Sequence, residues 1–125
     1  MSWDSYVATS LVGSGHVSMG AITGFDGSVW AQTKGMNLKK DEAKKIYAGF
    51  DDQSSLFETG IVIGGIKYIF LGGGEFLKGK KGQDGVIVYK SNTALVIGIY
   101  KDGIQTGNCS SVCGKFADWL KDNGY

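Results

Sequence analysis

Residues 60–101 have the sequence GIVIGGIKYIFLGGGEFLKGKKGQDGVIVYKSNTALVIGIYK, whose pattern indicates a β-sheet. Short apolar runs rich in isoleucine and valine alternate here with glycine clusters, which mark turns between strands. The runs predict five strands, at 60–63, 66–71, 75–78, 86–90 and 94–101, with connections at 64–65, 72–74, 79–85 and 91–93. Parallel neighbours would need crossovers of about a dozen residues or more, so the short connections predict an antiparallel meander.

Two further strands and a helix precede the meander. The dipeptide Asp26-Gly27 is a strong hairpin signal, and it lies between apolar runs at 17–24 and 28–32. Residues 38–50 then predict a short amphipathic helix. Its inward positions are Ala43, Ile46, Tyr47 and Phe50.

Both ends of the chain predict helices. Residues 2–12 can begin with Ser2 as the cap, and Trp3, Val7 and Leu11 fall on one stripe of that helix. Residues 108–122 predict a second helix, which ends at Asn123-Gly124. Its inward positions are Val112, Cys113, Phe116 and Leu120.

The order of these elements predicts an α+β fold. A chain of 125 residues is long enough for one domain and too short for two ordinary ones, so we expect a single domain over 1–125. The two terminal helices can share one face of a sheet. The predicted fold is therefore a central antiparallel sheet with the N- and C-terminal helices packed on one face and the short helix on the other.

The charged residues restrict the class of partner. All 13 basic residues are lysine, and the net charge is +1. Residues 1–60 carry five lysines against seven acidic residues, a balance of −2, whereas residues 61–125 carry eight against five, a balance of +3. Base reading and bidentate phosphate recognition favour arginine, so we expect no nucleic-acid partner. A diffuse lysine surface suits acidic protein or lipid partners better.

Two further features favour a cytosolic protein with reduced cysteines. No apolar run reaches the roughly 18 residues of a membrane span, and residues 1–6 lack the basic and apolar regions of a signal peptide. On one helix the Cβ atoms of Cys109 and Cys113 would lie about 5–6 Å apart, beyond the roughly 3.5–4.5 Å of a disulfide. We expect Cys113 to fill core space.

The sequence offers little for catalysis, metals or cofactors. His16, the single histidine, follows Gly-Ser-Gly and has no recognisable nucleophile partner, so we expect a surface loop residue. Residues 74–80 satisfy the phosphate-loop spacing G-x-x-x-x-G-K, but Lys81 replaces the hydroxyl residue that would hold magnesium. A strand follows instead of the helix whose N-terminus would bind phosphate. We therefore expect no enzyme, no metal site and no cofactor.

Aromatic residues near both chain ends indicate a binding surface. If the terminal helices pack side by side, five rings can converge: Trp3, Tyr6, Trp30, Trp119 and Tyr125. Aliphatic neighbours already supply the inward stripes of both helices, and an exposed aromatic patch marks a binding site. Rigid rings pack against proline rings, while indole N–H and phenol O–H groups donate to the free carbonyls of a polyproline II helix. Ordinary core packing is the alternative interpretation.

Several separated motifs resemble the profilin family. Residues 2–7, SWDSYV, resemble the opening of profilins, and residues 21–31, AITGFDGSVWA, match the family's strand, turn and groove tryptophan. Residues 61–68, IVIGGIKY, resemble its central hairpin, and residues 80–88 resemble its basic loop and next strand. Residues 103–120 resemble the approach to its C-terminal helix. The likeness covers the whole chain and is closest to the compact profilins of lower eukaryotes.

The resemblance implies a monomeric, non-enzymatic protein of the cytoplasm and cytoskeleton that binds monomeric actin and proline-rich proteins. Such a protein would regulate actin polymerisation and promote nucleotide exchange on actin. By similarity, the polyproline groove comprises Trp3, Tyr6, Trp30, Trp119, Leu120 and Tyr125. The matching actin-facing positions are Val62, Lys67, Lys78, Lys80, Lys90, Gln105, Gly107, Ser111 and Lys115. Phosphoinositide membranes are a further implied partner, through Lys78, Lys80, Lys81 and Lys90.

Two rival functions stay open at this point. One is an adaptor that binds proline-rich ligands but not actin, and the other is a peripheral phosphoinositide binder whose main function is its lysine cluster. Lys115 fits both an actin contact and an ordinary solvated helix residue. The loop lysines equally fit an ordinary charged loop.

Overall fold

The computed structural model describes residues 2–125, and its centre is a seven-stranded antiparallel sheet. The strands are β1 (Met19–Gly24), β2 (Val29–Gln32), β3 (Ile61–Ile63), β4 (Ile66–Gly73), β5 (Phe76–Lys81), β6 (Asp84–Lys90) and β7 (Ala94–Tyr100). Their spatial order is β2-β1-β7-β6-β5-β4-β3, so consecutive strands from β3 to β7 are neighbours. The predicted five-stranded meander is confirmed, and β1 joins it to the edge strand β2.

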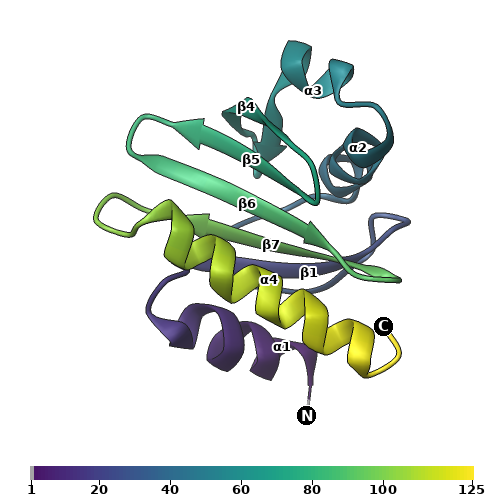
Figure 1. Ribbon diagram of the computed structural model, residues 1–125, viewed down its shortest axis with the longest axis vertical. Coiled ribbons are helices and arrows are strands. Elements are labelled where there is room, and N and C mark those ends of the chain that lie inside the picture. Colours follow the sequence, from purple (N-terminus) through teal and green to yellow (C-terminus); the bar gives the residue numbers. More distant parts are fainter. Residues whose placement is uncertain (1) are drawn as a thin grey trace.

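Helices cover both faces of the sheet, as predicted. The N-terminal helical segment comprises α1 (Trp3–Tyr6), the π-helical η1 (Val7–Leu11) and the 3₁₀ turn η2 (Val12–Ser14). It lies beside α4 (Thr106–Asp122) on one face, as Figure 1 shows. The helices α2 (Lys40–Asp51) and α3 (Ser54–Thr59) pack on the other face. This arrangement confirms the predicted α+β fold.

The sheet separates two layers of core, and β7 contributes to both. All seven of its residues are buried. Leu95, Ile97 and Ile99 pack toward α2, whereas Val96 and Tyr100 pack toward the terminal helices. A strand buried on both faces has a continuous apolar sequence rather than an alternating one. Burial of each such aliphatic side chain stabilises the fold by about 1.5–3 kcal/mol.

One predicted connection is wrong. The predicted loop over 79–85 is a turn at Gly82 and Gln83 only, because β5 continues to Lys81. Gly79 lies within the strand opposite Val86, where a Cβ atom would come within 3.0 Å of the valine side chain. This glycine therefore serves close packing, while Gly82 with its φ of +61° makes the turn.

One helix was not predicted. The short helix α3 buries a single apolar side chain, Leu56, so its sequence carries no helical periodicity. Asp52 precedes it and accepts hydrogen bonds from the main-chain N–H and the hydroxyl of Ser54, at 3.1 and 2.6 Å. Gly60 ends it with a φ of +75°.

Candidate ligand-binding surfaces

Five aromatic rings from distant parts of the chain meet at one end of the molecule. We call Trp3, Tyr6, Trp30, Trp119 and Tyr125 the aromatic cluster. The Trp3 ring centroid lies 4.9 Å from that of Trp30, 4.9 Å from that of Tyr125 and 5.7 Å from that of Tyr6. The Tyr6 ring in turn lies 4.9 Å from that of Trp119. The structure thus brings together all five rings in a continuous series.

Three elements and the segment after α4 position these rings. Ser2 caps α1 by accepting a hydrogen bond from the Ser5 N–H at 3.3 Å, and the first helical turn then carries both Trp3 and Tyr6. Trp30 comes from the edge strand β2, and Trp119 comes from the last turn of α4. The rings meet because the N-terminal segment packs against both β2 and α4.

The aromatic cluster is partly open to solvent. Trp119 is 39% exposed and Tyr125 is 41% exposed, while Trp3, Tyr6 and Trp30 are half-buried. Offset and edge-to-face packing leaves faces and polar tips of such rings available to a ligand. The cluster is therefore a preformed apolar surface with N–H and O–H donors.

The structure corrects one predicted groove residue and adds a supporting one. Leu120 is 0% exposed and lies in the core beneath the helices, so it cannot line a surface groove. Phe116, expected to face inward, is buried, but its ring also stacks on Trp119 at 5.6 Å and lies 6.0 Å from the Tyr6 ring. Phe116 therefore packs against Tyr6 and Trp119 on the buried side of the aromatic cluster.

A shallow groove of about 280 Å³ runs from Trp119 between α4 and the N-terminal helical segment. Its lining residues are Ser10, Ser14, Val112, Lys115, Phe116 and Trp119. Lys115 thus lies beside the aromatic cluster. On α4 it also lies one helical turn after Ser111, so it is between the aromatic cluster and the start of this helix.

A second surface lies on the part of the sheet that the terminal helices leave uncovered. Val62 of β3 is directly opposite Lys67 of β4, and Lys80 of β5 is opposite Ile69 of β4. Because side chains alternate along a strand, these residues share the face on which α4 packs farther along the sheet. We call this surface the open sheet face; it comprises Val62, Lys67, Ile69, Leu71, Lys78 and Lys80. Leu71 joins it at a β-bulge, where Leu71 and Gly72 together lie opposite Lys78.

The beginning of α4 lies near the end of the open sheet face where the β5–β6 turn is found. The connection from β7 to α4 lies next to this turn in Figure 1, and the Asp102 N–H donates to Asp84 Oδ1 at 3.0 Å. Gln105 occupies the N-cap position of α4, and Gly107 and Ser111 are exposed along the helix. The open sheet face and the start of α4 therefore lie next to each other.

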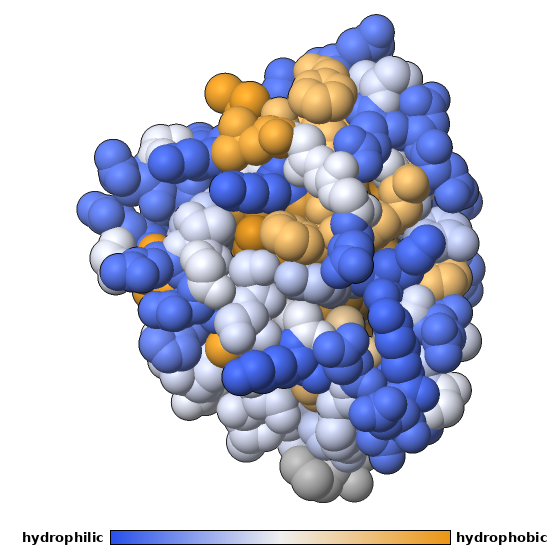
Figure 2. Space-filling view, in the orientation of Figure 1, coloured by the Kyte–Doolittle hydropathy of each residue, from blue (hydrophilic) through white to orange (hydrophobic). Residues whose placement is uncertain are grey.

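Sequence reasoning missed the apolar part of the open sheet face. Ile69 is 66% exposed and Leu71 is 51% exposed, and they lie among Lys67, Lys78 and Lys80. Figure 2 shows hydrophobic atoms gathered over this upper part of the molecule, above α4. The sequence carries a sign of this surface, because residues 68–71 are apolar at successive positions, as in a strand that is covered on both faces. Helices cover only one face of this part of the sheet, so the apolar side chains on the other face are exposed.

The structure does not bring the four predicted phosphoinositide lysines together. Lys78 and Lys80 lie on the open sheet face, whereas Lys81 points to the opposite face because side chains alternate along β5. Lys90 also points to the opposite face, where its Nζ lies 5.3 Å from the centroid of the Phe50 ring of α2. The expectation that Lys90 lies with the other actin-facing positions is therefore wrong: alternation along β6 turns its side chain toward α2.

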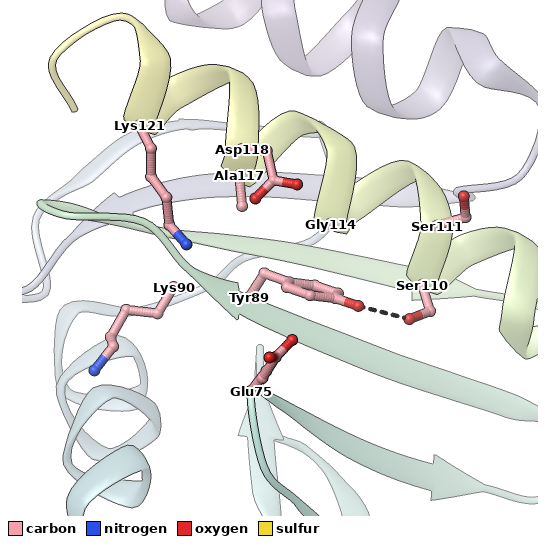
Figure 3. A pocket seen from close by; sticks show the side chains of 9 residues that line it. All are labelled: Glu75, Tyr89, Lys90, Ser110, Ser111, Gly114, Ala117, Asp118 and Lys121. Carbon is pink, nitrogen blue, oxygen red and sulfur yellow. Dashed lines mark hydrogen bonds between the residues drawn. The ribbon is translucent and has the colours of Figure 1, made fainter.

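A pocket of about 590 Å³ lies between α4 and the ends of β5 and β6. Figure 3 shows its lining residues: Glu75, Tyr89, Lys90, Ser110, Ser111, Gly114, Ala117, Asp118 and Lys121. The Tyr89 and Ser110 hydroxyls hydrogen bond at 3.0 Å across its floor. The Glu75 and Asp118 carboxylates and the Lys121 ammonium place charges of both signs at its rim, while the Lys90 ammonium turns away toward Phe50, so no cluster of like charges faces the pocket.

Reactive groups are few among residues 2–125. This part of the chain contains no cluster of three His, Cys, Asp or Glu residues that could hold a metal, and no helix there is long and apolar enough to cross a membrane. His16 is exposed, as predicted. The hydrogen bond with Cys109 and burial raise the pKa of the Cys113 thiol well above its usual range. Both cysteines are free and buried, which opposes a nucleophilic role.

Comparison with known proteins places these surfaces in context. The family model named Profilin matches residues 1–125. Profilin-A of Physarum polycephalum is 44% identical over 126 residues, with 100% of each chain covered. The structure of Acanthamoeba castellanii profilin IB has a TM-score of 0.94 and 34% identity, and the match covers 99% of this chain and 100% of that one.

A more distant structure, mouse profilin IIa in complex with a double repeat from the FH1 domain of mDia1, shares the fold. Its TM-score is 0.84 at 24% identity, with both chains covered completely. The family match extends over the whole chain, and a relative of high identity is covered from end to end. This chain therefore belongs to the profilin family.

Proposed function

We propose that this protein binds proline-rich segments through the aromatic cluster and monomeric actin through the open sheet face with the start of α4. In this proposal it is a single-domain regulator of actin polymerisation in the cytoplasm and cytoskeleton, acts as a monomer, and performs no chemistry itself. By holding the actin monomer in a more open state, it would promote exchange of actin's nucleotide.

The observation that carries the proposal is the continuity of the aromatic cluster. A polyproline II helix is already extended before it binds and leaves its carbonyls unpaired, so it loses little entropy on a rigid surface of rings and donors. Trp3, Trp30 and Tyr125 provide such a surface, with centroids 4.9 to 6.1 Å apart. The mouse profilin IIa complex with an FH1 repeat gives a precedent within the fold.

The open sheet face has the composition of a protein interface. Its centre is apolar, with Ile69 and Leu71 exposed, and Lys67, Lys78 and Lys80 surround them. Interfaces of this kind bury an apolar core within a polar rim, and lysines steer association with an acidic partner. Gln105, Gly107 and Ser111 would extend the contact along α4.

Phosphoinositide binding has less support than the other two activities. Lys78 and Lys80 can approach an anionic membrane together, and the electrostatic attraction contributes about 1 kcal/mol of binding free energy per lysine. Lys81 and Lys90 belong to the opposite face of the sheet, so they cannot join the same flat contact. We therefore propose that any lipid contact uses Lys78 and Lys80 and competes with actin.

Titration with polyproline, monitored by tryptophan fluorescence, tests the proposal. Trp3→Ala and Trp119→Ala should each abolish retention on immobilised polyproline while the circular dichroism spectrum stays folded, because each removes a ring from the series. Phe57→Ala is the matched control, since this ring is exposed on α3 and packs against Phe70. Normal retention of both tryptophan variants would remove the aromatic cluster from the site.

A monomer-binding titration with purified actin separates the proposal from the adaptor alternative. Dissociation constants in the micromolar range or below would support actin binding. A constant far above that range, with polyproline retention intact, would favour an adaptor of proline-rich ligands alone.

A further inference from the structure

Tyr125 is anchored on its N-terminal side by the end of α4. The Tyr125 N–H donates to the Leu120 carbonyl at 2.8 Å, and the Gly124 N–H donates to the Lys121 carbonyl at 3.2 Å. Gly124 has a φ of +87°. This pair of bonds with a left-handed glycine is a Schellman motif, which fixes the direction in which the chain leaves a helix.

A turn of the sheet anchors the other side of the same residue. The main-chain oxygen of Tyr125 accepts three hydrogen bonds: from the Thr93 N–H at 2.6 Å, from Thr93 Oγ1 at 2.8 Å and from Ser91 Oγ at 2.8 Å. Both donor residues lie in the connection between β6 and β7. Ser91 is itself buried, its N–H donates to the Ala94 carbonyl at 2.8 Å and its hydroxyl oxygen accepts the Ala94 N–H at 3.0 Å, so the anchor belongs to the central sheet.

This double anchor determines where the Tyr125 ring lies. The ring meets the edge of Trp3 at 4.9 Å and lies 6.1 Å from Trp30, yet 41% of the residue remains exposed. A side chain at the rim of a cluster gains less from burial than a core residue does, so its main-chain anchors matter more. A ring that must be ordered during binding lowers affinity, whereas a ring ordered beforehand does not.

We propose that Ser91 and Thr93 are positioning residues that hold the Tyr125 ring in the aromatic cluster and thereby set the affinity for a polyproline II ligand. Neither side chain needs to touch the ligand. The inference rests on the proposed function of the cluster and adds a site on the β6–β7 turn that determines how well the cluster is preorganised.

Replacement of the hydroxyl donors tests this inference. Thr93→Val removes one donor but keeps the branched shape, and the Ser91→Ala/Thr93→Val double variant removes two. The dissociation constant for a polyproline peptide should rise by about two- to tenfold, as expected when one side chain must be ordered on binding. Thr93→Ser should restore wild-type affinity, and Asn92→Ala, in the same turn, should leave it unchanged.

Two readouts distinguish positioning from a general structural effect. The ring-proton shifts of Tyr125 should move partway toward values for a free tyrosine in Thr93→Val, because the loss of one of the three bonds to its main-chain oxygen lowers the fraction of time that the ring lies beside Trp3 and Trp30. In a Tyr125→Ala background, Thr93→Val should cause no further loss of affinity, because the residue through which it acts is gone. If the double variant does not fold, Thr93→Val alone tests the positioning role, because Thr93 is exposed and its replacement leaves the core unchanged.

The possible outcomes separate this inference from the proposed function. Wild-type retention on polyproline together with unchanged affinity and unchanged Tyr125 shifts in Thr93→Val would overturn the positioning role and leave the proposed site intact. An equal loss of affinity in the Tyr125→Ala background would also overturn it. Failure of the wild-type protein to bind polyproline at all would overturn both.

Discussion

At the scale of single residues, glycines in the sheet are packing elements as much as turn elements. Gly98 lies in the middle of β7, paired with Gly20 on one side and Ile87 on the other. A Cβ atom at this position would overlap Cys113 Sγ and come within 3.3 Å of Cys109 Sγ. The absence of a side chain at Gly98 thus lets α4 approach the sheet closely, with the two thiols against the strand.

Gly98→Ala should therefore destabilise the protein by about 1–3 kcal/mol, the usual cost of overpacking a core. Urea unfolding would measure this loss. Gly107→Ala is a suitable control, because nothing lies within 4 Å of a Cβ built there and alanine favours a helix. Combining Gly98→Ala with Cys113→Ala should recover part of the lost stability; a strictly additive double variant would contradict the proposed overlap.

At the scale of elements, strand alternation decides which lysines act together. Lys80 and Lys81 are neighbours in the sequence, but they lie on opposite faces of β5. The sequence alone suggested one basic loop, because residues 79–85 resembled an irregular turn. The pairing of Lys80 with Gly85 and of Lys81 with Asp84 shows that the strand continues to Lys81, so the two lysine side chains point to opposite faces.

The Lys78→Ala/Lys80→Ala double variant should weaken actin binding by about two- to thirtyfold, at 0.2–1 kcal/mol for each exposed charge contact. The loss should shrink at high salt. Lys81→Ala makes the matched control, since it removes the same charge from the opposite face. Equal effects of Lys80→Ala and Lys81→Ala in a monomer-binding titration would argue against the open sheet face as the actin surface.

Most helices and strands could be predicted from the sequence, because glycine clusters separate its apolar runs clearly. Its errors have physical causes. A glycine required for close packing, such as Gly79, looks the same in a sequence as a glycine required for a turn. The helix α3 has one buried side chain, so its sequence shows no helical periodicity of apolar residues. Trp119 and Leu120 are adjacent on α4, but a rotation of about 100° per residue places one at the surface and the other in the core.

At the scale of the whole molecule, the two surfaces lie toward opposite edges of the sheet. Trp30 belongs to the edge strand β2 and Val62 belongs to the edge strand β3, with five strands between them. At about 4.8 Å per strand, this separation is roughly 25–30 Å along the sheet. The burial of one surface by a ligand would therefore leave the other accessible.

Polyproline and actin should bind this protein simultaneously and nearly independently. The dissociation constant for actin should change by less than about twofold when polyproline is saturating, because no residue is shared between the two proposed surfaces. Isothermal titration of actin with and without a polyproline peptide would measure this. Trp3→Ala should retain actin affinity, and strict competition between the two ligands would show that the surfaces overlap.

The contact between Trp3 and Tyr125 joins the first helical turn to the last residue, so it closes a loop of nearly the entire chain. Contacts of such long sequence separation carry the largest loop-closure entropy and depend on the sheet that brings the ends together. We therefore expect the aromatic surface to form late in folding, and a polypeptide that lacks residues 119–125 has only three of the five rings. Recognition by a ligand of this surface would thus distinguish finished molecules from partly synthesised or partly folded ones.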